Sequence, residues 1–600
     1  MTTRTTQNPI TTLTENVLQM RERSPAQTAI MYKADGQWIK LTWQQYYKQI
    51  EVIAAGLLQM GIKPGDRVAI FANTRFEWCV MDYAIMGIGA IVVPVYQTVT
   101  ADDLQFILND CQARAIVVEN KATLKTFEIV RARCASVETV FAIENSAAQD
   151  KKVIGWQQLQ SLGGERLKNK TEEFAALCAK PKSSDTATLL YTSGTTGMPK
   201  GVVLTHLQGI SEVSEAFPYE GVTTEDIALT FLPYAHILGR IEHWGQTYIG
   251  YTLAFAESIE KIKQNLVEIR PTIMVAVPRI FEKVYSGLWT QVESNFAVNK
   301  LFRWALAIGL KVGDLKLKHE PIPLPLLAQY RLAHKLALGK VKEAFGGRLK
   351  FAISGGAPMP REIAYFFHAC EILILEGYGL TETTAAITVN APFDYHFGSV
   401  GKPIGEVQLK IAEDGEVLVK SDKVMKEYYN NPQATKEAFI DGWFCTGDIG
   451  EILPSGDLKI TDRKKDLIKT AGGKYVAPQR LENLLKTHSF ISQILIHGDQ
   501  RKFIVALLTL DKPYILNFAR DKNINYTDYA SLTQHPQVLE LVRKAVAETN
   551  SHLAHFETIK RFAVLPNDFT VEAGELTPSL KVKRKFLDKK FSRQIESLYQ

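Results

Sequence analysis

The sequence predicts an α/β fold, with a large N-terminal domain of layered α/β subdomains and a small α+β C-terminal domain. Over most of the 600 residues, short apolar runs alternate with longer amphipathic runs, and strand–helix alternation of this kind is typical of largely parallel sheets. The pattern changes at a dense charge run, residues 462–466, which is followed by Gly472-Gly473. We therefore expect an N-terminal domain over residues 1–464, a C-terminal domain over 465–600 and a hinge at Lys465.

The individual elements follow from the length and periodicity of the apolar runs. A helix is expected over 75–86, and Thr100 is a candidate N-cap for a second helix over 101–112. The uncharged run 83–96 is shorter than the roughly 20 apolar residues of a membrane span, so it is interpreted as a buried helix followed by a strand. Strands are expected at 67–72, 90–93, 115–118, 187–190, 227–232, 252–256, 272–277 and 349–354, and in the second domain at 491–497 and 503–510, with helical pattern to the end.

The composition is that of an ordinary globular protein. Hydrophobic residues make up 46% and charged residues 22%, and the net charge is +6, which argues against disorder and against nucleic-acid binding. The six cysteines include no CxxC pair, and the two nearest, Cys111 and Cys134, are 23 residues apart. This spacing excludes a zinc ribbon or a disulfide scaffold and suits a reducing cytoplasm. Residues 1–23 show no secretory signal pattern, so we expect a cytoplasmic protein.

A loop of unusual composition follows the strand expected at 187–190. Residues 191–201 read Tyr-Thr-Ser-Gly-Thr-Thr-Gly-Met-Pro-Lys-Gly. Glycines allow backbone N–H groups to approach an anion, the hydroxyls add donors, and Lys200 adds charge. The loop is not a Walker A motif, because Lys200 is flanked by Pro199 and Gly201 rather than by Gly and Ser or Thr. The alternative is a flexible surface turn.

The loop resembles the phosphate loop of the adenylate-forming superfamily, which includes acyl-CoA synthetases, firefly luciferase and peptide-synthetase adenylation domains. Within this superfamily the chain looks most like the long-chain fatty acyl-CoA synthetases, on the stretches 441–465, 277–283 and 340–358. The likeness covers roughly residues 25–595. Five further family elements occur in the family's order, at residues 232–236, 353–358, 376–383, 442–448 and 462–466.

The resemblance implies a reaction in two halves. A fatty carboxylate attacks the α-phosphate of ATP, giving an acyl-adenylate and pyrophosphate, and the thiol of coenzyme A then attacks the acyl carbon and releases AMP. The implied partners are therefore a fatty acid, ATP, Mg²⁺ and coenzyme A. Two alternatives stay open: an acyl-AMP ligase that loads a carrier protein, and a catalytically silent scaffold of the same fold.

The resemblance also assigns the nucleotide site. Tyr378 would stack on adenine, Asp448 and Arg463 would bind the ribose, and Glu382 with Thr192 would bind Mg²⁺, a cation that prefers oxygen ligands. The β- and γ-phosphates would be held by Thr192, Ser193, Gly194, Thr195, Thr196, Gly197 and Lys200. The adenine elements further contain Gly356, Ala357, Glu376, Gly377, Gly379 and Thr381.

The catalytic residues implied by the resemblance are Lys200, His236 and a lysine near the C-terminus. His236 would lie near the substrate carboxylate, although a lone histidine is often a packing residue. The tail lacks the glycine of the usual family element, and counting from Leu576 places the lysine that reaches the α-phosphate at Lys583, with Lys581 as the fallback. This lysine cannot stay in place while coenzyme A enters, so the C-terminal domain would be mobile and rotate about Lys465.

Two more residues of the C-terminal domain are implied by the same resemblance. Lys469 would lie near the nucleotide. Tyr475 falls where some long-chain relatives carry a tryptophan that gates the acyl tunnel.

The charge is unevenly distributed along the chain. Residues 300–350 contain eleven Lys and Arg against three Asp and Glu, and residues 581–600 contain seven against two. In the first stretch the basic residues are mixed with Leu301, Phe302 and Trp304, which is compatible with peripheral association with an anionic membrane surface. The alternative for this stretch is a set of solvated helices in an insertion. A homodimer is also compatible with the sequence.

Overall fold

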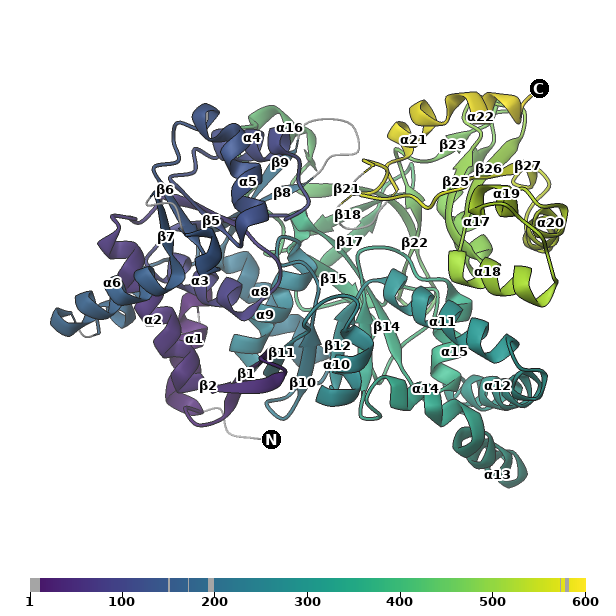
Figure 1. The fold of residues 1–600 in the computed structure, drawn as a ribbon, viewed down its shortest axis with the longest axis horizontal. Coiled ribbons are helices and arrows are strands. Elements are labelled where there is room, and N and C mark those ends of the chain that lie inside the picture. The colour runs from purple at the N-terminus through teal and green to yellow at the C-terminus, as the bar shows by residue number, and fades with distance from the viewer. Residues whose placement is uncertain (1–10, 149–151, 171, 193–198, 572, 578–581) are drawn as a thin grey trace.

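The computed structural model describes residues 11–148, 152–170, 172–192, 199–571, 573–577 and 582–600. Figure 1 shows the N-terminal elements at the left and centre and the C-terminal elements at the upper right. The fold class is the expected one, since two large, mainly parallel sheets covered by helices are joined to a smaller α+β unit. An antiparallel sheet that the sequence analysis did not anticipate lies between them.

The first large sheet contains eight strands and runs parallel from β8 to β7, whereas β9 and β19 are antiparallel additions at one edge. Its strands are short and buried on both faces, which is why they read as continuous apolar runs. Along the sheet they are β19 (Glu427–Tyr428), β9 (Lys200–Thr205), β8 (Thr186–Thr192), β4 (Ile91–Val95), β3 (Arg67–Phe71), β5 (Ala115–Val118), β6 (Thr139–Ala142) and β7 (Val153–Gly155).

The second large sheet contains nine strands and is parallel from β1 to β14, with β2, β15 and β16 added antiparallel at the edges. Parallel strands point their carboxyl ends to one edge, which is where ligands bind in sheets of this kind. Along the sheet they are β16 (Lys402–Pro403), β15 (Ala385–Val389), β14 (Ile374–Leu380), β13 (Phe351–Ser354), β12 (Ile273–Ala276), β10 (Ile227–Thr230), β11 (Thr252–Phe255), β1 (Thr28–Ala34) and β2 (Gln37–Thr42).

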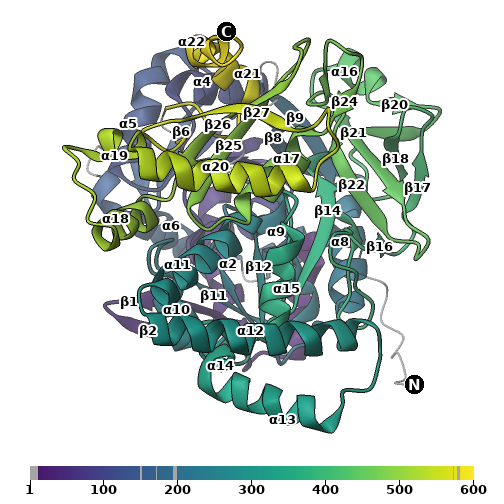
Figure 2. The same cartoon turned by 90° about the vertical axis from the view of Figure 1, so that its right-hand side faces the viewer.

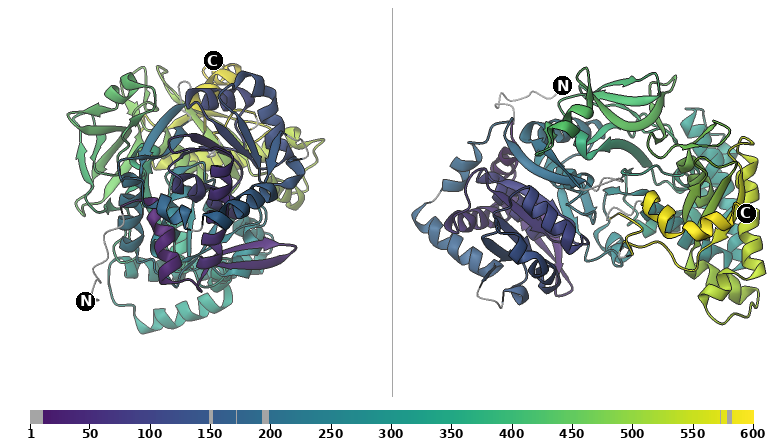
Figure 3. Two further views of the ribbon diagram at one scale, coloured as in Figure 1. Left: turned by 90° about the vertical axis from the view of Figure 1, so that its left-hand side faces the viewer. Right: turned by 90° about the horizontal axis from the view of Figure 1, so that it is seen from above.

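The third sheet is antiparallel, with β22 paired to β21 beyond the main run. In Figure 3, seen from above, it lies beside the N-terminal sheets. Its strands are β17 (Gln408–Ile411), β18 (Glu416–Lys420), β21 (Trp443–Ile452), β20 (Phe439–Ile440) and β22 (Leu458–Arg463). The register of β21 and β22 sets Asp448 opposite Arg463.

Helices cover both faces of the large sheets, and most of them follow a parallel strand. Thr100 caps α4 as expected, because its hydroxyl accepts a hydrogen bond from the Asp103 amide. In chain order these elements are α1 (Leu13–Arg23), α2 (Trp43–Gln59), α3 (Phe76–Gly87), α4 (Ala101–Asp110), α5 (Lys121–Val130), η1 (Arg131–Arg133), η2 (Asn145–Ala147), α6 (Trp156–Asn169), α7 (Glu173–Cys178), α8 (His206–Tyr219), α9 (Ile237–Ile249), α10 (Ile262–Ile269), α11 (Pro278–Glu293), α12 (Phe296–Leu317), α13 (Leu324–Ala333), η3 (His334–Leu338), α14 (Gly339–Ala344), α15 (Arg361–Ala369), η4 (Thr381–Thr383) and α16 (Pro432–Glu437).

The elements after Arg463 bury an apolar cluster of their own, from Ile468 to Val564. The expected strands β25 (Ile491–His497) and β26 (Ile504–Leu510) are present, but a third strand, β27 (Ile559–Val564), lies in a region read as helical. Its apolar residues are interrupted by Lys560 and Arg561, so the strand pattern is weak. The other elements are β23 (Ile468–Lys469), β24 (Tyr475–Val476), α17 (Pro478–Lys486), α18 (Lys512–Asp521), α19 (Tyr529–Thr533), α20 (Pro536–Ser551), α21 (Arg584–Lys590) and α22 (Ser592–Ser597).

A buried ion pair joins the two large sheets. Asp82 on α3 and Arg240 on α9 are both fully buried and in direct contact, and Arg240 Nη1 also donates to Thr188 Oγ1 on β8 at 2.5 Å. Trp244 Nε1 donates to Asp82 Oδ2 at 3.2 Å. Burial alone would raise the pKa of Asp82, but Arg240 and His243 hold that pKa below its ordinary value. The ion pair therefore fixes α9 against the strand that leads into the loop at 193–198.

Candidate active site

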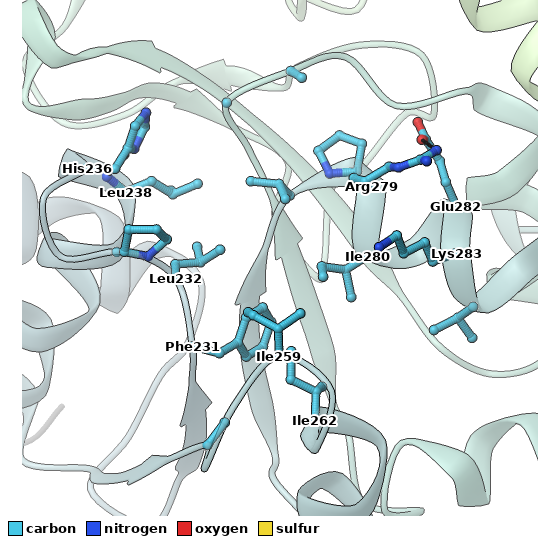
Figure 4. Close-up of a pocket in the computed structure, with 18 of the residues that line it drawn as sticks. Phe231, Leu232, His236, Leu238, Ile259, Ile262, Arg279, Ile280, Glu282 and Lys283 are labelled. Atoms are coloured by element: carbon cyan, nitrogen blue, oxygen red, sulfur yellow. Dashed lines mark hydrogen bonds and ion pairs between the residues drawn. The ribbon is translucent and has the colours of Figure 1, made fainter. Parts of the chain in front are cut away.

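A cavity of about 2170 Å³ opens at the carboxyl edge of the nine-stranded sheet and reaches the C-terminal elements. The segments that follow β10, β11, β12 and β13 all line it, together with β14 itself. Figure 4 shows Phe231, Leu232 and His236 on one side of this space and residues of α11 on the other. The cavity has a polar part beside β14 and β21 and an apolar arm that extends along α11.

The polar part is organised around Asp448. The Tyr378 hydroxyl donates to Asp448 Oδ2 at 2.7 Å, and Arg463 Nε lies 3.2 Å from Asp448 Oδ1. All three side chains line the cavity. Burial and the charge of Asp448 raise the pKa of Tyr378 well above its ordinary value, so this hydroxyl keeps its proton. The structure thus brings together the three residues expected at adenine and ribose.

Glu376 adds a buried carboxyl group to the same wall. Its side chain is 6% exposed, Oε2 accepts a hydrogen bond from the Met359 amide at 3.2 Å, and Oε1 has no hydrogen-bond partner among the described residues. Burial raises the pKa of Glu376 to about 7. Gly356, Ala357, Gly377 and Gly379 line the cavity around it.

One of these glycines is required by a close backbone contact. A Cβ at Gly379 would lie 1.3 Å from the carbonyl oxygen of Ala385, which no side chain could tolerate. Thr381 is the first residue of η4, directly after β14, and does not line the cavity.

His236 lies at the N-terminus of α9 and lines the cavity. Its Nδ1 accepts a hydrogen bond from the Leu238 amide at 3.1 Å. In the neutral ring the proton is therefore on Nε2, which is a donor. The side chain of His236 therefore caps helix α9 and also lines the cavity.

The residues expected at the phosphates form a second group beside this cavity. Thr192 and Lys200 face each other at the ends of β8 and β9, and Lys200 Nζ lies 4.8 Å from the centre of the Tyr428 ring. The Tyr428 hydroxyl donates to Glu382 Oε1 at 2.8 Å. Tyr428, from β19, is a residue that the sequence analysis missed. Of the other expected residues, Ser193, Gly194, Thr195, Thr196 and Gly197 lie outside the described part of the chain.

The donor set near Glu382 fits Mg²⁺. Glu382 and Thr192 offer a carboxylate and a hydroxyl, both oxygen ligands of the kind that Mg²⁺ prefers. Within the described ranges, no group of three or more His, Cys, Asp or Glu could hold a metal ion by itself. A site with so few protein ligands suits a cation that is bound mainly by nucleotide phosphates and water.

The expected C-terminal residues lie at or outside the rim of the cavity. Lys465 is exposed in the turn after β22. Lys469 lies against the ring of Tyr475, which is 60% exposed. Lys583 precedes α21 and its amide donates to the Glu575 carbonyl at 2.9 Å. Its neighbours Val582 and Arg584 line the cavity, whereas Lys583 itself does not, and Lys581 is outside the described residues.

The apolar arm is enclosed by α10, α11, α12, η3 and α14. Sequence reasoning could not identify its lining, because these residues are spread over more than 100 positions and look like ordinary core residues. They include Phe231, Leu232, Ile262, Leu266, Val277, Ile280, Val284, Leu288, Val292, Phe302, Ala337, Val341 and Phe345.

Helix α11 also contacts the C-terminal elements. Arg279 donates to the carbonyl and the hydroxyl of Ser492, at 3.0 and 2.8 Å, and Glu282 lies 3.7 Å from Lys486 Nζ. Tyr514 on α18 donates to Glu293 at 2.8 Å. The stretch 277–283 was singled out in the sequence, but these contacts with the C-terminal elements were not.

Comparisons with known proteins agree with this geometry. The AMP-binding enzyme family matches residues 18–429, and the AMP-binding enzyme C-terminal domain matches residues 465–600. Long-chain-fatty-acid–CoA ligase FadD15 of Mycobacterium bovis is 36% identical over 94% of this chain and 93% of its own length. Long chain acyl-CoA synthetase 7 of Arabidopsis thaliana is 31% identical over 94% of this chain and 82% of its own.

Solved structures share the fold at low sequence identity. The adenylation domain of a carboxylic acid reductase from Segniliparus rugosus, in complex with AMP and a co-purified carboxylic acid, is 19% identical with a TM-score of 0.77. It covers 99% of this chain and 95% of that one. The adenylation domain of a carboxylate reductase from Mycobacterium chelonae is 22% identical with a TM-score of 0.75, covering 99% and 92%.

The raised pKa of Glu376 predicts a pH-dependent effect of Glu376→Gln on stability. The folded-state pKa of about 7 exceeds the ordinary value of 4.5, so the protonated carboxyl favours folding below pH 4.5 and this contribution is lost as the pH rises through 7. Glutamine cannot titrate. Urea unfolding should therefore show the variant gaining about 3 kcal/mol relative to the parent between pH 4.5 and 7.5. A difference that is constant with pH would contradict the assignment.

Proposed function

The chain belongs to the AMP-binding enzyme family, and from this premise we infer that it is an ATP-dependent long-chain fatty acid–CoA ligase. It converts a fatty acid, ATP and coenzyme A into acyl-CoA, AMP and pyrophosphate through an acyl-adenylate. The observation that carries this conclusion is the cavity, in which the polar part around Asp448 and Glu376 continues into an apolar arm. Relatives named long-chain-fatty-acid–CoA ligase match 94% of the chain.

Neither alternative from the sequence is favoured. A carrier-loading acyl-AMP ligase would share the adenylation site. The relatives that match 94% of this chain, however, are named as a long-chain-fatty-acid–CoA ligase and a long chain acyl-CoA synthetase. A silent scaffold would not require Tyr378 and Arg463 to hold Asp448 at the wall of a cavity.

We propose that Asp448 binds the ribose hydroxyls. The carboxylate of Asp448 lines the cavity beside Tyr378 and Arg463, and carboxylate oxygens accept hydrogen bonds from hydroxyl groups. The ring of Tyr378, held by its hydroxyl, would stack on adenine. Glu376 Oε1, a buried acceptor without a partner among the described residues, would accept a hydrogen bond from the adenine amino group. Gly356, Ala357, Gly377 and Gly379 would let the base approach the backbone.

The phosphates are assigned to the loop at 192–200, with Lys200 supplying positive charge. Bound Mg²⁺ neutralises charge on the phosphate oxygens and so assists attack by an anionic carboxylate. Glu382 and Thr192 would hold this cation, and Tyr428 orients the Glu382 carboxylate by its 2.8 Å hydrogen bond.

The fatty acid is assigned to the apolar arm, with its carboxylate directed towards His236. The arm is lined mainly by aliphatic and aromatic side chains, which favour an alkyl chain by about 0.8 kcal/mol for each buried CH₂. The Nε2 proton of neutral His236 would donate to the carboxylate. This arrangement brings the carboxylate towards the phosphate side of the cavity.

The C-terminal unit is proposed to move as a body, with residues 465–600 rotating about Lys465 relative to 1–464. An exposed turn residue such as Lys465 can change its backbone angles without disturbing a core. Lys583, one residue from the cavity wall, would reach the α-phosphate in the first half-reaction. Lys469 and Tyr475, which are exposed in this structure, would approach the nucleotide and the acyl tunnel only after rotation.

We further propose that helices α12 and α13 and the π-helical segment η3 form a membrane-docking face. They lie side by side (Figure 2) and expose large apolar side chains, foremost Phe296 at 84% and Leu324 at 80%. Lys300, Arg303 and Lys311 on α12 are exposed among them. Val298, Leu301 and Leu336 are exposed and also line the cavity, so the apolar arm reaches this face. Among the described residues, no helix is long and apolar enough to cross a bilayer.

Substrate-dependent AMP release tests the proposed function. Across carboxylic acids from acetate to oleate, AMP formation with coenzyme A should be greatest for the long acids, because only they fill the apolar arm. Replacing coenzyme A with a phosphopantetheinyl carrier protein should abolish turnover. Equal or faster acyl transfer to the carrier protein would instead support the acyl-AMP ligase, and no fatty-acid-dependent ATP–pyrophosphate exchange would support the scaffold.

Lys583→Ala should suppress adenylate formation and spare the second half-reaction. Removing the ammonium group takes away a charge that contacts the α-phosphate only during adenylation, a loss of about 10²-fold or more. Thioester formation from supplied acyl-adenylate and coenzyme A should keep the parental rate. Lys585→Ala, an exposed residue of the same basic tail, is the matched control. Equal loss of both half-reactions in Lys583→Ala would refute its assignment.

Vesicle flotation tests the membrane-docking face. Binding to phosphatidylserine vesicles should fall about 30-fold in the double variant Lys300→Gln, Lys311→Gln, because each basic residue near an anionic surface contributes about 1 kcal/mol. Raising the salt concentration should have the same effect. The control pair Lys121→Gln, Lys125→Gln lies on α5. Flotation that is insensitive to salt and to both pairs would contradict the proposal, and sedimentation as a dimer through this face would assign it to a second copy instead.

A further inference from the structure

The turn that follows the proposed Mg²⁺ ligand Glu382 has a strained backbone. Thr384 and Ala385 have φ values of 55° and 79°, which place two successive residues with side chains in the left-handed region. A β-branched residue is rarely found there. Such conformations persist only where the surrounding structure imposes them, and they concentrate at functional sites.

Four hydrogen bonds tie this turn to two other segments. The Thr384 hydroxyl donates to the Lys423 carbonyl at 2.8 Å, and the Met425 amide donates to the Glu382 carbonyl at 2.6 Å. On the other side, the Ala386 amide donates to Glu212 Oε1 at 3.0 Å. Lys423 Nζ donates to the Ala386 carbonyl at 3.2 Å. The turn is therefore held from both ends.

The side chains of Lys423 and Glu212 form a buried ion pair. Lys423 Nζ lies 3.1 Å from Glu212 Oε2 and 3.1 Å from Glu215 Oε2, and the side chains of Lys423 and Glu212 are both fully buried. Glu212 and Glu215 come from α8, which follows the strand that begins at Lys200. A buried ion pair is weak evidence for stability, because desolvation cancels much of the attraction, but it fixes geometry.

The segment that carries Lys423 also carries Tyr428, whose hydroxyl holds the Glu382 carboxylate. Glu382 is thus fixed at its backbone carbonyl by Met425, at its carboxylate by Tyr428, and through the following turn by Lys423 and Glu212. These contacts lead back to β9, the strand that begins at Lys200, because Tyr428 pairs with Val202 of β9 and Glu212 lies on α8, directly after β9.

We propose that Glu212 and Lys423 are positioning residues that hold the strained turn at Thr384 and Ala385 and so set Glu382 for the Mg²⁺ that accompanies ATP. This inference rests on the proposed role of Glu382 as a Mg²⁺ ligand. Replacing a residue that holds a metal ligand in place by hydrogen bonding commonly weakens metal affinity by about 10- to 100-fold.

The test measures cation binding directly. Mn²⁺ stands in for Mg²⁺, and free Mn²⁺ is followed by electron paramagnetic resonance in the presence of a non-hydrolysable ATP analogue. Glu212→Leu removes the acceptor for the Ala386 amide while Lys423 keeps Glu215 as a partner, and the Mn²⁺ dissociation constant should rise about tenfold. Glu212→Gln keeps an acceptor oxygen and should stay within about threefold of the parent.

Two further variants separate positioning from general loss of stability. Glu173→Leu, at the start of α7, breaks a part-buried ion pair with Arg166 of α6. This pair is far from the turn in sequence, so Mn²⁺ binding should stay unchanged. Thr384→Gly removes the hydroxyl bond to the Lys423 carbonyl but relieves the strain at positive φ. Thr384→Gly should weaken Mn²⁺ binding severalfold without a matching fall in unfolding temperature. This variant therefore still tests the proposal if Glu212→Leu does not fold. Mn²⁺ binding that follows unfolding temperature across all variants would overturn the proposal.

Glu382→Gln separates the assignment of Glu382 as a Mg²⁺ ligand from the positioning role of Glu212 and Lys423. If it weakens Mn²⁺ binding and Glu212→Leu and Thr384→Gly do not, the positioning inference fails and the proposed function stands. If Glu382→Gln leaves Mn²⁺ binding unchanged, the assignment of Glu382 fails and the positioning inference fails with it.

Discussion

The relative placement of the two large sheets depends on one buried charge, the carboxylate of Asp82. It lies on α3 beside the first sheet and is neutralised by Arg240 on α9, a helix that follows a strand of the second sheet. Loss of one partner from a buried pair typically costs about 3–5 kcal/mol, because the other charge is left uncompensated. The bond from Arg240 to Thr188 extends this restraint to β8. Helix α9, which begins at Ile237 and is capped by His236, and strand β8 are thereby fixed relative to each other.

This restraint allows the polar and apolar parts of the cavity to share one wall. Strand β14 carries Glu376, Gly377 and Tyr378 along the nucleotide side and continues into η4, where Glu382 meets Tyr428. The second sheet contributes the segments after its parallel strands, and the antiparallel sheet contributes Asp448. In the proposed function, an acyl chain and a nucleotide would therefore meet at the carboxyl edge of one sheet, as a reaction between a carboxylate and an α-phosphate requires.

Helix α11 serves two parts of the molecule. One face of α11 lines the apolar arm through Ile280, Val284 and Leu288. The two ends of the helix contact the C-terminal unit through Arg279 and Glu293. These contacts are polar and part-buried, which is compatible with the proposed rotation of the C-terminal unit. The C-terminal unit buries its own apolar cluster, which the proposed rotation about Lys465 would leave intact.

The sequence alone determined the fold class, most of the parallel strands and the motifs that carry the proposed nucleotide residues, because these depend on local patterns. The strand at Ala115–Val118 is a continuous apolar run, and Tyr378, Asp448 and Arg463 lie in contiguous motifs. Only the tertiary structure revealed the Tyr428 contact with Glu382, the Glu212–Lys423 pair and the lining of the acyl arm. Each depends on side chains that are distant in sequence and carry no local pattern, since a buried lysine reads as a surface residue until its partner is seen. Strand β27 was missed for a related reason, because pairing with β26 rather than its own apolar content makes it a strand.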